Sequence, residues 1–172
     1  LLYSACGVTG TEYMFGNIET SLRSVPSAGG LCSSQLWVFP RRLEKLNNLV
    51  SFYDSINNSL AITGIEVTNK VLEAFLDAKK CDPAVIVAIS SRFDNLIDKY
   101  GQRGYRDALL DAGHLGQNIY LAATALGLGV YSSCGFIDQE INGLCGMDGI
   151  SESFTYVFYL GLKSDTNKLL VD

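Results

Sequence analysis

The segment Ala84–Ser90 has the sequence AVIVAIS, a nearly uninterrupted apolar and β-branched run of strand length. Strands with one face in solvent alternate apolar and polar residues, whereas strands buried on both faces are apolar throughout. We therefore predict that Ala84–Ser90 is an interior strand of a sheet covered on both sides. Phe154–Leu160 is predicted as a second buried strand, and the two are expected to form the centre of the sheet.

The rest of the chain mixes helical patterns with short strands. The segments predicted as helices are Val67–Asp77, Ser91–Tyr100, Arg106–Leu126, Asp138–Leu144 with Asp138 as its cap, and Leu1–Cys6 ending at Gly7. The segments predicted as further strands are Leu36–Phe39, Val130–Ser133, and a hairpin of Leu49–Tyr53 and Leu60–Thr63 around Asn57-Asn58. Gly10–Gly30, rich in Ser, Thr and Gly, is predicted as loop. Because no regular βαβ alternation occurs, we expect one α+β domain over residues 1–172.

The composition excludes several classes of protein. Of the 172 residues, 48% are hydrophobic and 18% are charged, which is enough apolar material for a core and rules out intrinsic disorder. The net charge of −5 argues against nonspecific nucleic-acid binding, which needs clustered Lys and Arg. The longest nearly apolar stretch, Ile119–Val130, is far short of the roughly 20 residues that cross a bilayer. We therefore expect neither a nucleic-acid nor a membrane partner.

Cysteine and histidine usage makes a metal site or a disulfide framework improbable. The five cysteines are scattered without a C-x-x-C pair, and His114 is the single histidine. We interpret the cysteines as small buried hydrophobes in a reducing, cytoplasmic compartment, and His114 as a structural residue.

The predicted helix Arg106–Leu126 has small residues at helical spacing. Ala108, Ala112 and Gly116 stand four apart, which lets a neighbouring element approach closely. Gly113 and Gln117 have the same spacing. Glycine inside a helix costs about 1 kcal/mol relative to alanine, so Gly113 and Gly116 each need a packing or ligand reason. Two interpretations remain open, namely tight packing within the molecule and a helix at the centre of a dimer.

Two glycine-containing segments are candidates for ligand contact. The run Ser27–Gly30 exposes backbone N–H groups and permits close approach of a ligand, although most such runs are plain turns. It is neither a Walker A loop nor a G-x-G-x-x-G fingerprint, which argues against NTP hydrolysis and a Rossmann NAD site. The segment Gly127–Phe136, GLGVYSSCGF, either places backbone groups against a planar cofactor or is a helix stop followed by an edge strand.

A third segment, Lys99–Arg106, holds two tyrosines and three cations within eight residues of an acidic chain. A lysine ammonium stabilises the phenolate of a neighbouring tyrosine when the pair is desolvated, which would create a proton-transfer pair at Lys99 and Tyr100. The alternative is a solvated helix end whose cations face the C-terminal dipole.

Taken in order, these segments resemble a known family. The motifs P-S-A-G-G, K-Y-x-x-R-G-Y-R, G-H-x-x-Q-N-x-x-L-A-A-x-x-L-G-L-G and G-F are similar to those of nitroreductase-like FMN flavoproteins. Within that family they resemble the azoline dehydrogenases, the flavin subunits of microcin-type and streptolysin-type thiazole/oxazole synthetases. The resemblance covers residues 1–163, and its most specific part is Lys99–Gly129.

The resemblance implies an α+β sandwich in which helices flank a central, mostly antiparallel sheet. It implies a homodimer that binds two FMN molecules between its subunits. The implied activity is an FMN-dependent dehydrogenase or oxidase that converts peptide thiazolines or oxazolines to thiazoles or oxazoles in the biosynthesis of bacteriocin-like natural products. The implied partners are a peptide substrate, a second copy of the chain and a cyclodehydratase subunit.

The resemblance also assigns roles to individual residues. It makes Lys99 and Tyr100 the catalytic pair associated with removal of a proton from the azoline ring. It assigns the following residues to FMN, with Lys163 at the phosphate: Pro26, Ser27, Ala28, Gly29, Arg103, Arg106, Gln117, Cys134, Gly135 and Lys163.

The chain departs from its apparent relatives in two places. Relatives continue the P-S-A-G-G loop with Leu-Tyr-Pro and a Glu, whereas this chain has Leu31-Cys32-Ser33-Ser34-Gln35, which leaves the substrate class open. Relatives also carry an Arg-x-Ser-type element upstream of the position of Leu1, so we expect this domain to lack an N-terminal flavin contact. Two alternatives therefore remain: another flavin reductase of the same fold, and an inert scaffold subunit of a heterocycle-forming synthetase.

Overall fold

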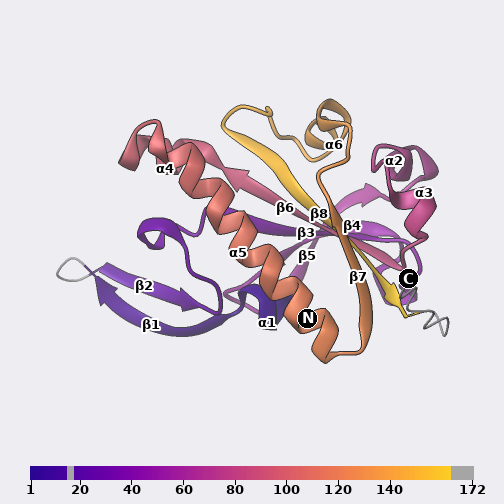
Figure 1. Cartoon of the computed structure of the whole chain (residues 1–172), viewed down its shortest axis with the longest axis horizontal. Coiled ribbons are helices and arrows are strands. Elements are labelled where there is room, and N and C mark those ends of the chain that lie inside the picture. The colour runs from indigo at the N-terminus through magenta and orange to yellow at the C-terminus, as the bar shows by residue number, and fades with distance from the viewer. Residues whose placement is uncertain (15–17, 164–172) are drawn as a thin grey trace, which may run out of the picture.

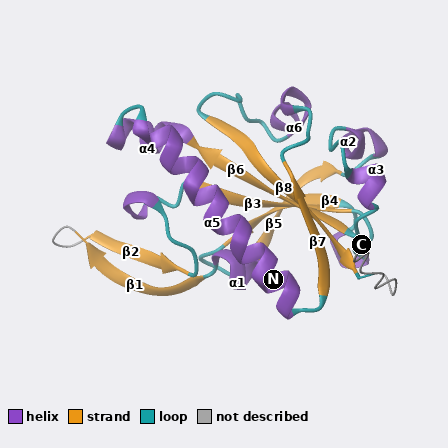
Figure 2. Ribbon diagram, viewed as in Figure 1, coloured by secondary structure: helices purple, strands orange, loops and turns teal. Residues whose placement is uncertain are grey.

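A six-stranded antiparallel sheet forms the centre of the computed structural model, which describes residues 1–14 and 18–163 (Figures 1 and 2). The strand order is β5-β4-β3-β6-β8-β7. The strands are β3 (Ser34–Pro40), β4 (Leu49–Asp54), β5 (Ser59–Glu66), β6 (Val85–Arg92), β7 (Leu128–Ser133) and β8 (Glu152–Leu162). The predicted α+β class and the mostly antiparallel sheet are confirmed.

The two apolar runs are neighbours inside the sheet, as predicted. β6 pairs with β8 over its whole length, from Val85 opposite Leu160 to Arg92 opposite Glu152. Alternate side chains of β6 enter different cores, because successive residues of a strand point to opposite faces. Ile86 and Ala88 belong to one buried cluster, and Val87 and Ile89 belong to the other.

Helices cover both faces of the sheet. The long helix α5 (Arg103–Ala125) and the short α1 (Leu2–Cys6) lie on one face, whereas α2 (Asn69–Glu73), α3 (Ala78–Cys81) and α6 (Asp138–Leu144) lie on the other (Figure 1). α4 (Phe93–Tyr100) follows β6 and packs against the beginning of α5. Two 3₁₀ turns complete the elements, η1 (Ala28–Gly30) and η2 (Glu44–Leu46).

The prediction of a loop over Gly10–Gly30 was wrong for most of its length. β1 (Val8–Met14) and β2 (Ile18–Arg23) pair with each other in a separate two-stranded sheet that projects from the body (Figure 1). The two strands pair only with each other, in a sheet separate from the central one. Neither strand packs one face on the core, so the segment lacks the alternation of apolar and polar residues that marks a half-buried strand. Its threonines and tyrosine nevertheless favour extended backbone.

The predicted helix Val67–Asp77 is also shorter in the structure. Thr68 Oγ1 accepts a hydrogen bond from the Val71 N–H, so α2 begins as expected, but it ends at Glu73. The backbone of Phe75 instead forms a bridge with Phe136, and its ring is 1% exposed and lies 5.0 Å from that of Phe39. Burial of this aromatic ring has overridden local helix propensity.

Two smaller expectations concern element ends. The hairpin of β4 and β5 turns at Asn57-Asn58 as predicted, with Asn58 in the left-handed region at φ 47°. The predicted cap of α6 was wrong, because Ile137 occupies the N-cap position and Asp138 is the first helical residue. An acidic residue there still faces the favourable end of the helix dipole.

The small residues of α5 pack inside the molecule. Ala108, Ala112 and Gly116 are buried, and a Cβ at Gly116 would lie 2.8 Å from the ring of Phe158 in β8. For Gly116 this favours the first of the two interpretations, close packing within one chain. The expectation was wrong for Gly113, which is exposed and where a Cβ would meet no atom of the described residues within 4 Å. His114 lies on the opposite, exposed side of the helix.

The cysteines are free thiols in the structure, and the described residues contain neither a metal-ligand cluster nor a helix suited to a membrane. Cys6 is buried, Cys134 is exposed and none of the five is in a disulfide. Burial raises the pKa of the Cys145 thiol to about 12. Within residues 1–14 and 18–163, no cluster of potential metal ligands occurs, and no helix there combines the length and apolarity needed to cross a membrane.

Candidate functional site

A buried carboxylate holds the Pro-Ser-Ala-Gly-Gly loop against α5. Asp111, which is 6% exposed, accepts hydrogen bonds from Ser27 Oγ at 2.7 Å and from the Ala28 N–H at 3.0 Å. Ser33 Oγ donates to the same carboxylate at 3.2 Å, and Ser27 Oγ accepts from the Cys32 N–H at 2.8 Å. These hydrogen bonds fix the Pro-Ser-Ala-Gly-Gly loop at Ser27 and Ala28 before the turn and at Cys32 and Ser33 after it.

Asp111 was missed by the sequence interpretation. An aspartate in a long helix is usually solvent-exposed, so Asp111 was not considered as a buried residue. Its role depends on Ser27, Ala28 and Ser33, which lie about eighty residues earlier. The signal that could have found it is its position one residue before Ala112, on the helix stripe that faces the sheet.

The structure brings Lys99 and Tyr100 together with Gly29. Lys99 Nζ donates a hydrogen bond to the Gly29 carbonyl oxygen at 3.3 Å and lies 5.4 Å from the centre of the Tyr100 ring. Gly29 has a left-handed φ of 59°, and a Cβ there would overlap Tyr100 Oη and lie 2.7 Å from Lys99 Nζ. The loop and the predicted catalytic pair thus form one site, in which the left-handed backbone at Gly29 favours glycine and any side chain there would displace the ends of Lys99 and Tyr100.

The connection between α4 and α5 places this pair. Gly101 follows Tyr100 with a φ of 62°, which ends α4. Gly104 lies in the first turn of α5, where a Cβ would overlap the backbone of Leu96. Only glycine allows the two helices to approach so closely, and this approach fixes the direction in which α4 presents its last residues.

Both side chains of the pair are exposed in the single chain. The proton-transfer interpretation required a desolvated pair, because an ammonium in water keeps its proton. The water-excluding surface is therefore not supplied by the described residues of one chain. It must come from a bound molecule or from a partner if the pair is to act in this way.

Cys134 and Gly135 lie at the end of β7, on the same end of the sheet as the loop. The Gly135 N–H donates to Ser133 Oγ at 2.9 Å, and its carbonyl accepts from the Leu76 N–H at 3.0 Å, so both backbone groups are engaged. Cys134 is exposed, and its thiol lies 3.6 Å from the Thr155 carbonyl oxygen. β8 and β6 separate this turn from β3 and the loop, a width of about 14 Å for three strand spacings.

The remaining predicted cofactor residues are dispersed. Arg103 and Arg106 are exposed in the first turn of α5, close in sequence to Tyr100. Gln117 is exposed about 16 Å further along the same helix. Lys163 follows the end of β8, whereas Cys134 lies beside Thr155 near its beginning, so the structure places these two candidates at opposite ends of β8.

Comparison with known proteins identifies the family. The chain belongs to the nitroreductase family of oxidoreductases, whose family model matches residues 11–162. It is 32% identical over 143 residues to MJ1384 of Methanocaldococcus jannaschii, a nitroreductase by name; the match covers 82% of this chain and 68% of that protein.

Solved structures show the same fold. A nitroreductase-type protein of Anabaena variabilis is 27% identical with a TM-score of 0.79, over 92% of this chain and 33% of that one. A chain of the E. coli microcin synthetase complex McbBCD, with truncated pro-MccB17 bound, is 23% identical with a TM-score of 0.75, over 95% of this chain and 62% of that one. The chain thus spans about a third of the Anabaena protein and less than two thirds of the synthetase chain.

Proposed function

We propose that this protein is an FMN-dependent dehydrogenase that oxidises peptide thiazolines or oxazolines to thiazoles or oxazoles. The observation that carries the proposal is the convergence of the predicted catalytic residues Lys99 and Tyr100 on Gly29 of the Pro-Ser-Ala-Gly-Gly loop. The fold shared with a chain of a peptide-modifying synthetase supports it.

The described residues suit a planar, anionic cofactor, and nitroreductases generally use FMN. Pro26, Ser27, Ala28 and Gly29 would border one edge of the cofactor. Cys134 would approach from the opposite edge, while the exposed guanidinium of Arg103 or Arg106 offers a cation for the phosphate. Bound FMN supplies the hydride acceptor of the oxidation.

The residues of this chain would provide the proton transfer. Forming an aromatic azole from an azoline removes two hydrogens, one of them as a proton from a ring carbon. Lys99 Nζ, held at 3.3 Å by the Gly29 carbonyl, is in position to accept that proton once it is in the neutral amine form. The Tyr100 hydroxyl, beside the same glycine, would complete the proton path.

A second copy of the chain would supply the surface that excludes water from Lys99 and Tyr100. The exposed side of α5 carries Leu110 and Leu121, which are 54% and 60% exposed, with the exposed His114 and Gln117 between them at helical spacing. Large apolar side chains on one solvent-facing helix stripe are typical of an interface. We propose that this stripe is the subunit interface, and a cyclodehydratase subunit remains the proposed source of the azoline peptide.

The experiment is mass spectrometry of an azoline-containing peptide incubated with the full-length protein and FMN. We expect a loss of two hydrogens per ring. Lys99→Gln should lower the rate by about 10²–10⁴-fold, the usual contribution of a general base, and Tyr100→Phe should lower it less. Lys79→Gln is the matched control, since Lys79 is also exposed but lies on α3, away from the loop.

The outcomes separate the alternatives. Full activity of Lys99→Gln would contradict the assigned base. A protein that binds FMN and reduces small nitroaromatic compounds, but leaves the azoline peptide unchanged, would be a different flavin reductase. A protein that binds no FMN and changes no peptide would be an inert scaffold subunit.

A further inference from the structure

A small cavity lies beside the Pro-Ser-Ala-Gly-Gly loop, between the end of β2, the start of β3 and the middle of α5. Its walls include the buried side chains of Cys6, Asp111 and Leu115, which shield its interior from bulk water. The space open to the centre of a water molecule is about 10 Å³. A compact space of that volume is about 2.7 Å across, about one hydrogen-bond length, so it holds one water and no organic ligand.

Two residues that line this cavity have a buried polar atom without a hydrogen-bond partner in residues 1–14 and 18–163. These atoms are Arg23 Nε and Ser34 Oγ. Arg23 Nη1 lies 3.8 Å from Cys6 Sγ, which places the guanidinium against the cavity wall. Ser34 precedes Leu36 by two residues in β3, so both side chains point toward α5. Leaving a buried donor unpaired is costly, and a molecule bonded to both atoms removes that cost.

Asp111 brings a free acceptor to the same cavity. Its Oδ2 accepts three hydrogen bonds, whereas its Oδ1 accepts one, from the Ala28 N–H, within the part of the chain that the structure describes. A carboxylate oxygen has two lone pairs, so Oδ1 can accept one bond more.

The charges around the cavity favour a neutral molecule in it. Arg23 forms no ion pair with any described residue, so its positive charge faces the negative charge of Asp111 without a direct contact. The carboxylate would repel an anion, and the guanidinium would repel a cation. Water can instead accept a hydrogen bond from Arg23 Nε and donate one to Asp111 Oδ1.

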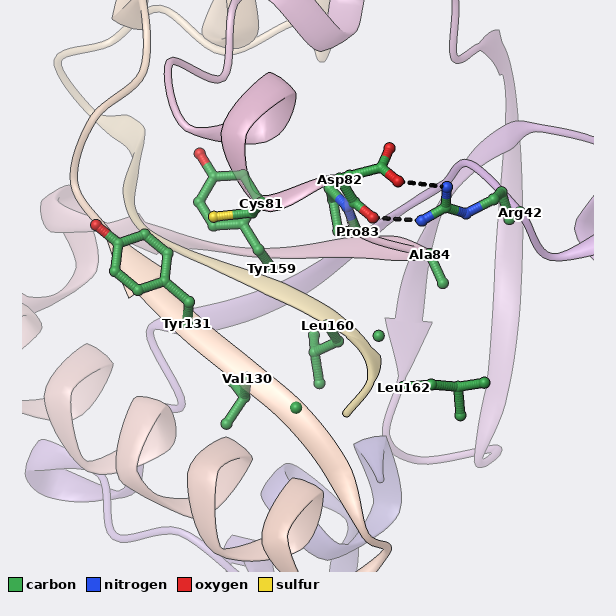
Figure 3. A pocket seen from close by; sticks show the side chains of 12 residues that line it. Arg42, Cys81, Asp82, Pro83, Ala84, Val130, Tyr131, Tyr159, Leu160 and Leu162 are labelled. Carbon is green, nitrogen blue, oxygen red and sulfur yellow. Dashed lines mark hydrogen bonds and ion pairs between the residues drawn. The ribbon is translucent and has the colours of Figure 1, made fainter. Parts of the chain in front are cut away.

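A much larger cavity, of about 600 Å³, lies between β7, β8 and the loop before β6 (Figure 3). Its two charged lining residues, Arg42 and Asp82, are paired with each other. The small cavity differs because its polar atoms are not paired, and unpaired polar atoms are what specify a ligand.

We propose that the small cavity binds one water molecule as a fixed part of the fold. The water accepts a hydrogen bond from Arg23 Nε, bonds to Ser34 Oγ and donates to Asp111 Oδ1. Three partners are the usual number for a buried water. Arg23 ends β2 and Ser34 begins β3, so the water joins both ends of the segment that contains the loop to the carboxylate on α5.

Water–protein NOE spectroscopy of the full-length, nitrogen-15-labelled protein tests this proposal. The Arg23 Nε–H resonance is assigned by its disappearance in Arg23→Lys. We expect this proton to give a cross-peak at the water frequency, with opposite signs in NOESY and ROESY spectra. Opposite signs mark a water that stays bound longer than the protein takes to tumble, and they exclude chemical exchange of the Nε proton itself.

Two substitutions of Ser34 separate the water from the serine hydroxyl, whose proton also exchanges with solvent. Ser34→Ala removes the hydroxyl but keeps the cavity and two polar partners, so the cross-peak should persist. Ser34→Val places a methyl group where the water lies, so the cross-peak should be lost. Ser59→Val is the matched control, since Ser59 begins β5 as Ser34 begins β3 but is exposed, and it should keep the cross-peak.

Loss of the water should also loosen the loop. The Ala28 amide, which donates to Asp111, should exchange its hydrogen at least about tenfold faster in Ser34→Val than in Ser59→Val, because one bond to the charged carboxylate is gone. Equal exchange rates in the two variants would refute the bridge.

The unchanged protein and the variants can each overturn the proposal. It is wrong if the Arg23 Nε–H of the unchanged protein gives no such cross-peak, if the cross-peak survives in Ser34→Val, or if it disappears in Ser34→Ala. A saturable shift of the same resonance with sodium bromide, at constant ionic strength, also overturns it, because the cavity would then hold an anion.

Discussion

Replacing Asp111 tests whether the loop is held by one buried carboxylate. Asp111→Ala removes the acceptor of three donors, namely Ser27 Oγ, the Ala28 N–H and Ser33 Oγ. Asp111→Asn is the conservative partner, because it keeps the shape and one acceptor oxygen but removes the charge. The two variants together separate the loss of hydrogen bonds from the loss of volume.

The expected magnitude follows from those three bonds. A hydrogen bond to a charged group contributes about 1.5–3 kcal/mol, and a buried donor left without an acceptor costs about 1–3 kcal/mol. The serine hydroxyls can rotate toward other acceptors, whereas the Ala28 N–H cannot. We therefore expect Asp111→Ala to lower the free energy of unfolding by about 3–5 kcal/mol and Asp111→Asn by about 1–2 kcal/mol. For a chain of this length, the larger loss lowers Tm by about 6–20 °C.

Urea unfolding, monitored by the fluorescence of Trp37, the single tryptophan, measures the free energy of unfolding. Hydrogen exchange at the Ala28 amide reports whether the loop opens locally before the protein unfolds. If Asp111→Ala stays within about 1 kcal/mol of the unchanged protein and the Ala28 N–H remains protected, the anchoring role of Asp111 is refuted.

The remaining predictions concern two glycines and one carboxylate. Gly104→Ala should destabilise the protein by about 3 kcal/mol, because its Cβ would overlap the Leu96 backbone, whereas Gly113→Ala should stabilise it by about 0.5–1 kcal/mol; urea unfolding checks both. Hydrogen bonds from Ser151 Oγ and neighbouring backbone N–H groups hold the pKa of Asp148 well below its ordinary value of 3.8. Its contribution to stability is complete above that value and is lost as pH falls through the lower, folded-state pKa. Carbon-13 NMR titration should show this midpoint, and Ser151→Ala should raise it.

The centre of the sheet was predictable because β6 and β8 are buried on both faces, and two-sided burial leaves an apolar run in the sequence. The β1–β2 hairpin was missed for the opposite reason. Its strands have no buried face of their own, as the 70% exposure of Tyr13 shows, so no periodic pattern marks them. Pairing between two polar segments is determined by their mutual hydrogen bonds, which composition does not record.

The candidate site was predictable only in part. The resemblance supplied Lys99, Tyr100 and Gly29, and the structure brings these three together. The distance of Lys163 from Cys134 depends on the length of β8 and on the strand order, which a local motif does not contain. Asp111 lay outside every motif, because its donors come from a loop that meets α5 only in the folded chain.

The position of β6 in the sheet has a consequence for how the protein folds. Val87 pairs with Val38 and with Phe158, about fifty residues earlier and about seventy residues later in the chain. During synthesis, β6 can therefore pair on one side well before its other neighbour exists. The most apolar strand of the sheet keeps an open edge until β8 leaves the ribosome, and unwanted strand pairing with other chains is most favourable in that interval.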